Sequence, residues 1–424
     1  MKAITLIDAN NFYASCEQSI NPALAGKPIV ILSNNDGCII ARSSEARNLG
    51  IQMGTPYFKI KHKLNSLGII SCSSNYELYG DISQRLMNLL KMQCEELEVY
   101  SIDEAFGFIS RPNNLDLRPW ARSLRILIYQ NLGIPISIGI GKSKVQAKIA
   151  NKLAKRDPKE SGIFDISTNS KKNYYLENID IKDIWGIGSK SSEWLRSRGI
   201  RNALQFRDIS NSKISNKLGI TGKRLQLELR GENCIPFKRK ENQKKEITVS
   251  RSFSKPIANI RELSESLALY ITIASYKLRK QGLLTRNICV FIRTNPFSSN
   301  EFHNLTSYRT LNEPTNNTQI LIKTSIEILV SIYKADLKFT KAGVIMRKLS
   351  NDKYIQRSIN YREKTKESHK GEILMNTIDN INKKFGEGSI YWAASGIKRE
   401  WEMRRNLLSY VSTTNIKRIP LVIT

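Results

Sequence analysis

The stretch VYSIDEAFGFI, residues 99–109, places two acidic residues, Asp103 and Glu104, between two short apolar runs. Two apolar runs joined by a short polar break are typical of a β-hairpin, which would carry these carboxylates at its tip. A second apolar run, AITLID at residues 3–8, predicts a strand that ends on Asp8. If the strands are antiparallel neighbours in one sheet, the three carboxylates lie within a few ångströms of one another.

Three clustered carboxylates repel one another unless cations neutralise their charge. Oxygen ligands suit Mg²⁺, and two such ions roughly 3.5–4 Å apart form the two-metal site of phosphoryl transfer. The alternative is that these residues are ordinary turn acids at strand ends. That alternative is the better one for Asp8 taken alone, whereas the cluster of three favours a functional site.

The composition points to a folded protein with a polyanionic partner. The chain has 424 residues, 67 of them Lys or Arg and 38 Asp or Glu, which leaves a formal net charge of +29. At roughly 150 residues per domain, this length predicts about three domains. A hydrophobic content of 40% excludes wholesale disorder. The charge favours nucleic acid or an anionic membrane surface, with a functionally neutral basic surface as the alternative.

Other classes of protein are disfavoured. No window approaches the roughly 18 uninterrupted apolar residues of a membrane helix, and the start lacks the pattern of a signal peptide. We therefore expect no membrane association and a cytoplasmic location. The six cysteines form no CxxC pair and the three histidines show no metal-ligand spacing. A disulfide scaffold, a structural zinc site and histidine chemistry are thus disfavoured.

Strands and helices alternate over residues 1–165, which predicts one α/β or α+β domain. We expect a hairpin over 28–41, a strand over 135–140, and helices over 43–49, 81–97, 120–132 and 143–155. Residues 172–235 change to short helices with Gly-rich turns, and 248–350 mixes strands with helices. The polar stretch 350–380 is expected to lack regular structure, and the last forty residues regain aromatic side chains.

The helix expected over 143–155 carries Lys144, Lys148, Lys152 and Lys155 on one stripe. Such a stripe is usually no more than a solvated face. A triphosphate substrate would, however, need cations that are not metals, and both Arg47 and Lys155 are candidates.

The pattern IWGIG at residues 184–188, followed by Trp194-Leu195 and Gly199-Ile200, predicts a helix-hairpin-helix. Its two glycines, Gly186 and Gly188, would let backbone N–H groups approach a phosphate closely. Such a contact holds the nucleic-acid backbone without reading its sequence. A mere tight turn is the alternative.

Several longer motifs together resemble one known group. The sequence resembles the Y-family translesion DNA polymerases, in particular the UmuC branch, the catalytic subunits of bacterial DNA polymerase V. The resemblance covers nearly the whole chain and is carried by DANNFYASCE (8–17), SNNDGC (33–38), SNYELY (74–79), YSIDEAF (100–106), GKSK (141–144), KLAK (152–155), SRSF (250–253), KAGV (341–344), WAA (392–394) and TT (413–414).

The resemblance implies roles for single residues at the catalytic centre. Asp8, Asp103 and Glu104 would be the catalytic carboxylates. With the Ala9 carbonyl, they would ligate two Mg²⁺ ions.

It also implies a nucleotide site. Phe12 would lie under the incoming nucleotide, and the ring of Tyr13 would be the steric gate that rejects a ribose 2′-hydroxyl. Arg47 and Lys155 would bind the triphosphate. The sequence departs from many family members at Ser44, where they have a tyrosine, so we expect triphosphate binding to depend more on Arg47 and Lys155.

Contacts with DNA and with a sliding clamp are implied as well. Gly186, Gly188, Lys190 and Arg251 would bind the DNA backbone. Further basic residues would hold the duplex by its phosphates, namely Lys238, Arg239, Lys240, Lys244, Lys245, Lys277, Arg279 and Lys280. The clamp peptide of UmuC-type proteins matches a degenerate stretch here, with Gln356, Ile359 and Tyr361 as the clamp-binding candidates.

The implied fold is an α+β multidomain right-hand polymerase with a small C-terminal module. The expected domains are a palm (1–20 and 78–170), small fingers (21–77), a helix-hairpin-helix thumb (171–240), a linker (241–247), an α/β little finger (248–352) and a UmuC-type tail (353–424).

The implied function is error-prone, template-directed translesion synthesis in the SOS response, by two-metal nucleotidyl transfer from a dNTP to a primer 3′-hydroxyl without proofreading. Implied partners are primed DNA, dNTPs, a UmuD-type accessory subunit, a recombinase filament and the sliding clamp. Two other classes stay open. A two-metal phosphodiester hydrolase would use the same acids without Tyr13, Arg47 and Lys155. A non-catalytic DNA-binding scaffold would leave the acids idle.

Overall fold

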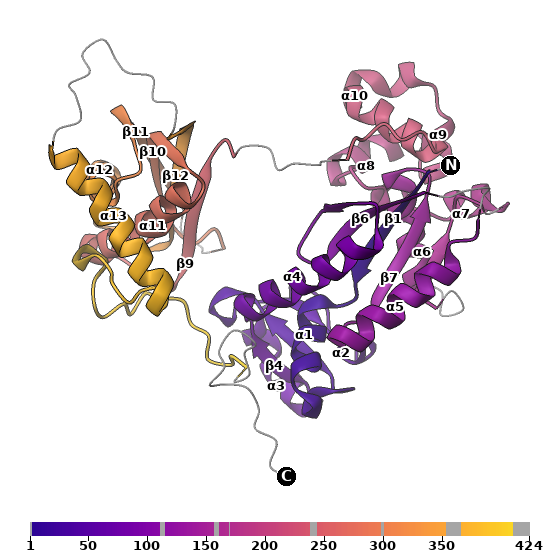
Figure 1. Cartoon of the computed structure of the whole chain (residues 1–424), viewed down its shortest axis with the longest axis horizontal. Helices are drawn as coiled ribbons and strands as arrows, with labels where there is room; N and C mark the ends of the chain where they lie inside the picture. Colours follow the sequence, from indigo (N-terminus) through magenta and orange to yellow (C-terminus); the bar gives the residue numbers. More distant parts are fainter. Residues whose placement is uncertain are drawn as a thin grey trace. The chain divides into compact units, whose positions relative to one another are not determined.

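The structure is a computed structural model that describes residues 2–110, 115–156, 161–168, 170–237, 244–297, 301–352 and 366–409. The chain forms two compact units, both drawn in Figure 1. The first unit comprises Met1–Glu241 together with Asn406–Thr424, and the second comprises Asn242–Arg405. In sequence, the second unit is therefore inserted between two segments of the first.

The first unit is built on a five-stranded sheet of order β5-β6-β1-β7-β8. Its strands are β5 (Glu96–Val99), β6 (Glu104–Ser110), β1 (Lys2–Ala9), β7 (Ile136–Gly141) and β8 (Ile163–Asp165). The predicted hairpin over 99–109 is confirmed, since β5 and β6 pair antiparallel and β6 also pairs antiparallel with β1.

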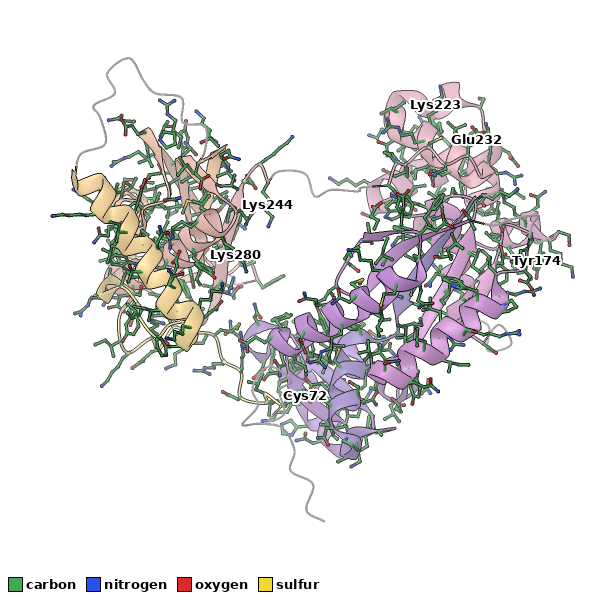
Figure 2. All side chains as sticks on the ribbon, in the orientation of Figure 1. Cys72, Tyr174, Lys223, Glu232, Lys244 and Lys280 are labelled. Carbon is green, nitrogen blue, oxygen red and sulfur yellow. The ribbon has the colours of Figure 1, made fainter. Side chains whose placement is uncertain are left out.

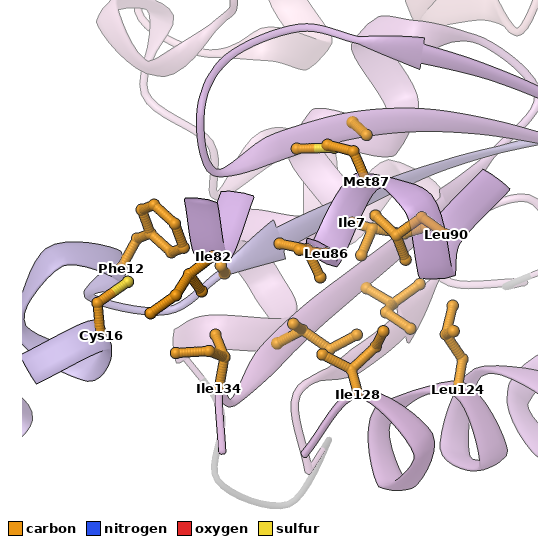
Figure 3. Close-up of a cluster of buried hydrophobic side chains, with 14 of the residues drawn as sticks. Ile7, Phe12, Cys16, Ile82, Leu86, Met87, Leu90, Leu124, Ile128 and Ile134 are labelled. Carbon is orange, nitrogen blue, oxygen red and sulfur yellow. The ribbon is translucent and has the colours of Figure 1, made fainter. Parts of the chain in front are cut away.

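Helices cover both faces of this sheet. On one face, α1 (Phe12–Ile20), α4 (Tyr76–Gln93) and α5 (Arg118–Leu132) bury an apolar core. Figure 3 shows this core between the helices and the strands, with Ile7 of β1 facing Leu86 and Leu90 of α4. On the other face, α6 (Lys144–Arg156) packs Ala147 against Ile4, Leu6 and Phe106.

Two glycines set how closely α6 approaches the sheet. A Cβ atom on Gly139 would lie 2.1 Å from the amide nitrogen of Asn151 and 2.3 Å from the carbonyl oxygen of Ala147. A Cβ atom on Gly141 would lie 2.8 Å from the amide nitrogen of Ala147. Because backbone atoms cannot yield at such distances, only glycine permits this contact between helix and strand.

A smaller sheet of order β3-β2-β4 lies in residues 21–77 of the same unit. The hairpin predicted over 28–41 is confirmed, since β2 (Ile29–Leu32) pairs antiparallel with β3 (Ile39–Arg42). Strand β4 (Ile70–Ser73) pairs parallel with β2. Its other elements are the helices α2 (Ser44–Asn48) and α3 (Tyr57–Ser66), and the 3-10 turns η1 (Pro22–Leu24) and η2 (Asn34–Asp36).

Short helices follow β8 and enclose a third apolar core with one side of α6. They are α7 (Lys172–Glu177), the 3-10 turn η5 (Ile181–Asp183), α8 (Ser189–Arg196), α9 (Ala203–Asp208) and α10 (Asn211–Arg230). Helix α10 is kinked at Gly219, whose φ is 55°.

The second unit is a four-stranded antiparallel sheet of order β11-β10-β12-β9, packed on helices. Its elements are β9 (Ile247–Ile257), α11 (Ile260–Lys280), β10 (Leu283–Arg293), β11 (Asn304–Thr315), α12 (Thr318–Ile332), β12 (Phe339–Asn351), α13 (Lys366–Phe385) and the 3-10 turn η6 (Ala393–Ser395). Trp401 joins this core and packs edge-on against Phe253 and Tyr270.

The expectation that residues 350–380 lack regular structure was wrong where α13 forms. Two interactions hold this helix on the second unit: Asp379 forms a two-pronged ion pair with Arg279, at 2.6 and 2.8 Å, and the side chain of Met375 is buried. Both are tertiary contacts, so the local composition of the segment does not reveal them.

Candidate active site

Asp8 and Glu104 lie directly opposite each other in the sheet. They are register partners in the antiparallel pairing of β1 with β6. Because side chains alternate along a strand, Asp8 points to the same face as Leu6, and Glu104 to the same face as Phe106. This is the face that α6 covers. The two carboxylates predicted from the sequence therefore meet under one helix.

Asp103 occupies the turn that precedes β6. Its main-chain carbonyl accepts a hydrogen bond from the amide of Ala9 at 2.9 Å, which ties the turn to the end of β1. Its carboxylate accepts a hydrogen bond from the Ser101 hydroxyl at 2.5 Å. The structure thus brings together Asp8, Ala9, Asp103 and Glu104 at the point where β1 ends and β6 begins.

The lysine stripe of α6 is not a solvated face. Each of its four ammonium groups forms an ion pair with a carboxylate of a different element. The pairs are Lys155–Asp8 at 2.5 Å, Lys148–Glu104 at 3.2 Å, Lys152–Asp183 at 2.5 Å and Lys144–Glu98 at 2.6 Å. Two of these pairs therefore hold the candidate catalytic acids.

Asp8 has an unusual protonation equilibrium. The pKa of its carboxyl group is raised to about 7: burial is the largest cause, Lys155 acts in the opposite direction, and the nearby Glu104 adds to the rise. The carboxylate is therefore a costly charge that a cation would stabilise. A strongly shifted acid beside a second acid is typical of a functional site.

Lys148 is a residue that sequence analysis did not single out for the site. Its ammonium lies 4.3 Å from the ring centroid of Tyr100 and 5.7 Å from that of Trp185. The indole N–H of Trp185 donates a hydrogen bond to the Tyr100 hydroxyl at 3.0 Å. Trp185, at the start of the predicted helix-hairpin-helix, thus contacts the same lysine that forms an ion pair with Glu104. Lys148 lies seven residues before Lys155 and therefore on the same face of the helix, and this spacing is the sequence feature that could have identified it.

Two of the predicted nucleotide-binding residues, Phe12 and Tyr13, lie at the start of α1. The side chain of Phe12 is buried, and the ring of Tyr13 stacks on Tyr79 of α4 with centroids 4.5 Å apart and planes 17° apart. Tyr76 packs edge-on against both of these tyrosines. The Tyr79 hydroxyl donates a hydrogen bond to the buried Glu17 carboxylate at 2.7 Å. The position of the Tyr13 ring is therefore set by α4.

Arg47 approaches the same region from α2. Its guanidinium donates a hydrogen bond to the side-chain oxygen of Asn11 at 3.1 Å, and its side chain is exposed. Asn11 has a left-handed φ of 50° and directly precedes α1. Arg47 and Tyr13 are thus tied to the same turn, whereas Ser44 at the start of α2 is exposed.

The predicted DNA-binding residues lie on exposed parts of both units. Gly186 has a φ of 91°, and Gly188, which directly precedes α8, has open space where a side chain would stand. Lys190, in the first turn of α8, is exposed, and so is Arg251 on β9. The side chains labelled in Figure 2 include two exposed lysines of the second unit, Lys244 and Lys280.

Two other expectations about binding residues fare differently. Arg279 was expected to bind the DNA duplex, but its side chain is only 10% exposed and its guanidinium forms an ion pair with Asp379. The clamp-binding candidates Gln356, Ile359 and Tyr361 lie outside the described residues, as do Lys238, Arg239 and Lys240.

The acidic cluster fits a divalent cation by its donor chemistry. It offers carboxylate oxygens and a main-chain carbonyl, the hard ligands that Mg²⁺ prefers. In the described part of the chain, no three acidic, histidine or cysteine side chains are arranged as a metal-binding group. Asp8 and Glu104 instead face lysine ammonium groups, which neutralise them where a metal would do so.

Comparison with known proteins matches most of the chain. The impB/mucB/samB family model matches residues 7–152, and the C-terminal domain of that family matches residues 244–359. The HHH motif of the IMS family matches residues 174–200, at the predicted helix-hairpin-helix. A domain of unknown function matches residues 372–422.

Relatives and solved structures agree with these matches. The chain is 35% identical to protein UmuC of Salmonella typhimurium over 412 residues, which span 96% of this chain and 97% of the relative. Protein SamB of Salmonella typhimurium is 34% identical over 420 residues, 98% of each chain. A solved Y-family DNA polymerase chimera has a TM-score of 0.64 at 21% identity and covers 82% of this chain and 98% of its own. The predicted multidomain α+β fold is thus confirmed.

Within the described residues, no helix is both long and apolar enough to cross a bilayer.

Proposed function

The chain belongs to the impB/mucB/samB family, in the UmuC branch of the Y-family DNA polymerases, and we propose that Asp8, Asp103 and Glu104 are its catalytic carboxylates. It is an error-prone, DNA-directed DNA polymerase of translesion synthesis that binds a DNA template and dNTPs. The observation that carries our assignment of the site is the opposed pair Asp8–Glu104, each member held by a lysine of α6.

Family membership implies a requirement for a divalent metal ion. We propose two Mg²⁺ ions, held by the carboxylates of Asp8, Asp103 and Glu104 and by the Ala9 carbonyl. Bound there, they would offset negative charge at the attacking and leaving oxygens of the transfer.

The basic residues of the site have a matching role. Without a metal, the Lys155 ammonium neutralises Asp8. Were the carboxylates neutralised by cations, the Lys155 ammonium would be free to bind the triphosphate together with Arg47. Lys148 keeps the Glu104 carboxylate oriented. The primer 3′-oxygen attacks the α-phosphorus in line, the new phosphodiester bond forms, and pyrophosphate leaves.

Choice of the sugar falls to Tyr13. Its ring, backed by Tyr79, would fill the space that a ribose 2′-hydroxyl needs, and Phe12 would lie under the nucleotide. The support from Tyr79 matters because a displacement of the Tyr13 ring by about 1 Å can strongly alter the choice between dNTP and rNTP.

We further propose the division of labour among the parts of the chain. Residues 1–20 and 78–170 would form the palm, 21–77 small fingers, 171–240 the thumb, 241–247 a linker and 248–352 the little finger, followed by the tail at 353–424. Small fingers close poorly over a base pair, which fits tolerance of damaged templates. Gly186, Gly188, Lys190 and Arg251 would bind DNA phosphates, so affinity should fall steeply with salt.

The cellular context is also proposed from the family. It comprises action in the SOS response without proofreading, a cytoplasmic location with the DNA, and three protein partners: a UmuD-type subunit, a recombinase filament and the sliding clamp. Gln356, Ile359 and Tyr361 are the clamp-binding candidates, and a pull-down with Gln356→Ala and Tyr361→Ala tests them.

Primer extension on a primed template with Mg²⁺ tests the proposed site. Asp103→Ala/Glu104→Ala should lower extension on the order of a thousandfold, because the charges that position the reacting oxygens are lost. The matched control is Glu313→Ala/Glu387→Ala, which removes two exposed acids of the second unit and changes the net charge equally. The control should extend primers like the wild type.

Three results would contradict the proposal. Extension by the double variant at the wild-type rate would show that other residues perform the chemistry. Shortening of the primer without dNTPs would indicate a hydrolase, and no extension even with accessory subunits would favour a non-catalytic scaffold.

A further inference from the structure

Three polar residues of the quoted motifs play no part in the proposed chemistry: Glu17, Asp36 and Asn75. Glu17 lies on α1 and is fully buried, and Asp36 ends η2. Asn75 caps α4, where its side-chain oxygen accepts a hydrogen bond from the amide of Leu78 at 3.3 Å. All three face one short segment near the end of the chain, residues 406–409, which we call the returning segment.

The returning segment is bound to the end of β4 through its backbone. The amide of Ser73 donates to the carbonyl of Leu407 at 2.9 Å, and the amide of Leu407 donates to the Ser73 hydroxyl at 2.9 Å. Figure 1 shows the last coloured residues beside β4, and Figure 2 labels the neighbouring Cys72. Because β4 is an edge of its described sheet, the segment satisfies backbone groups that an edge would expose.

Asp36 fixes the position of the segment along this edge. One oxygen of its carboxylate accepts a hydrogen bond from the Ser73 hydroxyl at 2.6 Å, and the other accepts one from the amide of Asn406 at 3.1 Å. The carboxylate thus joins the strand and the segment. Hydrogen bonds to a charged acceptor are stronger than neutral ones, so Asp36 makes the docking specific.

The far end of the segment reaches the buried carboxylate behind the nucleotide residues. The Ser409 hydroxyl accepts a hydrogen bond from the Asn75 side chain at 3.2 Å. It also lies beside Glu17, whose pKa is raised by burial and lowered in part by the hydroxyls of Tyr79 and Ser409. Glu17 in turn accepts the Tyr79 hydrogen bond, and Tyr79 stacks on Tyr13. The contacts that join Ser409 to Tyr13 run through Asn75, whose side chain caps α4 and whose carbonyl accepts a hydrogen bond from the Tyr79 amide.

We propose that the returning segment is a positioning element for the steric gate: its docking on Asn75 holds the start of α4 and Tyr79, and thereby the Tyr13 ring that rejects ribonucleotides. The inference rests on the proposed role of Tyr13. It gives a function to part of the domain of unknown function that matches residues 372–422. Ser409 accepts a hydrogen bond from the side chain that caps α4, so its loss should loosen the first turn of the helix, which carries Tyr79.

Ser409→Ala in the full chain tests the inference through the choice between dNTP and rNTP. The ratio of kcat/KM for the two should fall about fivefold, the equivalent of one hydrogen bond of about 1 kcal/mol. The rate with dNTP should change less than about twofold. Ser409→Thr, which keeps the hydroxyl, should restore the wild-type ratio. The matched control is Ser66→Ala on α3, since Ser66 is exposed and bonds to the Lys63 carbonyl of its own helix.

Hydrogen exchange provides a readout that does not depend on synthesis. Leu407→Pro removes the N–H group that donates a hydrogen bond to the Ser73 hydroxyl. This should weaken the docking, so the Ser73 amide hydrogen should exchange at least about tenfold faster than in the wild type. Unchanged exchange would overturn the docking. A Ser409→Ala variant with the wild-type ratio, alongside a Tyr13→Ala variant that accepts rNTPs, would overturn the positioning role. Tyr13→Ala with an unchanged ratio would instead overturn the gate itself, and with it the proposed role of the segment.

Discussion

The lysine stripe of α6 has a buried lysine at one end and a partly exposed lysine at the other. At one end, the Lys144 and Glu98 side chains are 1% and 8% exposed. The Lys144 ammonium also donates to the carbonyl of Pro236 at 3.0 Å and lies 4.7 Å from the ring centroid of Phe237. At the other end, the Lys155 side chain is 38% exposed and pairs with Asp8, whose side chain is 11% exposed.

The difference shows how one helix serves both the fold and the reaction. Lys144 is enclosed by β5 and by the chain that follows α10, so it has fixed partners and cannot leave them. Lys155 sits at the open end, where an ion pair is worth little net stability and is easily exchanged. Burial, more than residue type or spacing, therefore separates the structural lysine from the functional one.

The largest effect on stability is expected from breaking the buried ion pair between Lys144 and Glu98. Lys144→Met leaves the Glu98 carboxylate buried without its ammonium, which should lower the free energy of unfolding by about 3–5 kcal/mol. Urea unfolding of the full chain, read at the transition of the first unit, measures this loss. The double variant Lys144→Met/Glu98→Gln should recover part of it, because no unpaired charge remains. A single variant as stable as the wild type would mean that the pair is not buried in solution.

The next effect concerns Asp8 and depends on pH. Its folded-state pKa of about 7 lies above the ordinary 3.8, so its contribution to stability is complete below pH 3.8 and is lost as the pH rises through 7. Asp8→Asn, which cannot ionise, should therefore gain stability over the wild type as the pH rises. The gain should be small at pH 4 and on the order of 4 kcal/mol at pH 8.

Thermal unfolding with a chelator present measures the pH profile of this difference. The variant should lose primer extension, which would make Asp8 a residue kept for function at the expense of stability. A difference that does not change between pH 4 and pH 8 would contradict the raised pKa.

A smaller effect is expected from the open end of the row. Lys155→Ala should change the free energy of unfolding by less than about 1 kcal/mol, since the lysine is partly exposed. It should lower kcat/KM for dNTP by about 10- to 100-fold through loss of a triphosphate contact. Lys155→Arg should keep part of the activity. If Lys155→Ala unfolds as readily as Lys144→Met, the contrast between the two ends fails.

The smallest effect is expected in the middle of the row, at Lys148. Tyr100→Phe removes the hydroxyl that accepts the Trp185 hydrogen bond but keeps the ring under the ammonium. We expect a loss of about 1 kcal/mol or less in stability and about a two- to threefold decrease in kcat. Single-turnover extension detects a change of this size. A much larger loss would mean that the hydroxyl, rather than the ring, positions Lys148.

Much of this site could be predicted because its parts are local in sequence. The run around Asp103-Glu104 has the alternating pattern of a hairpin, and the structure contains that hairpin. The lysine row follows from helical spacing alone. What the row faces could not be predicted, because Glu98, Glu104, Asp8 and Asp183 come from separate elements whose packing depends on the close contact at Gly139 and Gly141.

The returning segment marks the other limit. Residues 406–409 have no apolar periodicity, and their binding to β4 uses backbone groups that any sequence would offer. The side chains that define the docking, Asp36 and Asn75, lie more than 300 positions earlier in the chain. Composition likewise gave no sign of α13, whose placement depends on the distant Arg279.

The order of segments along the chain has a consequence for proteolysis. A single cut between residues 237 and 244 would leave an N-terminal fragment with the catalytic acids and a C-terminal fragment with the second unit and residues 406–424. The second fragment would still hold the first through the bonds of Leu407, Asn406 and Ser409. The protein would then behave as a nicked complex whose halves copurify, with a noncovalent staple in place of the severed peptide bond.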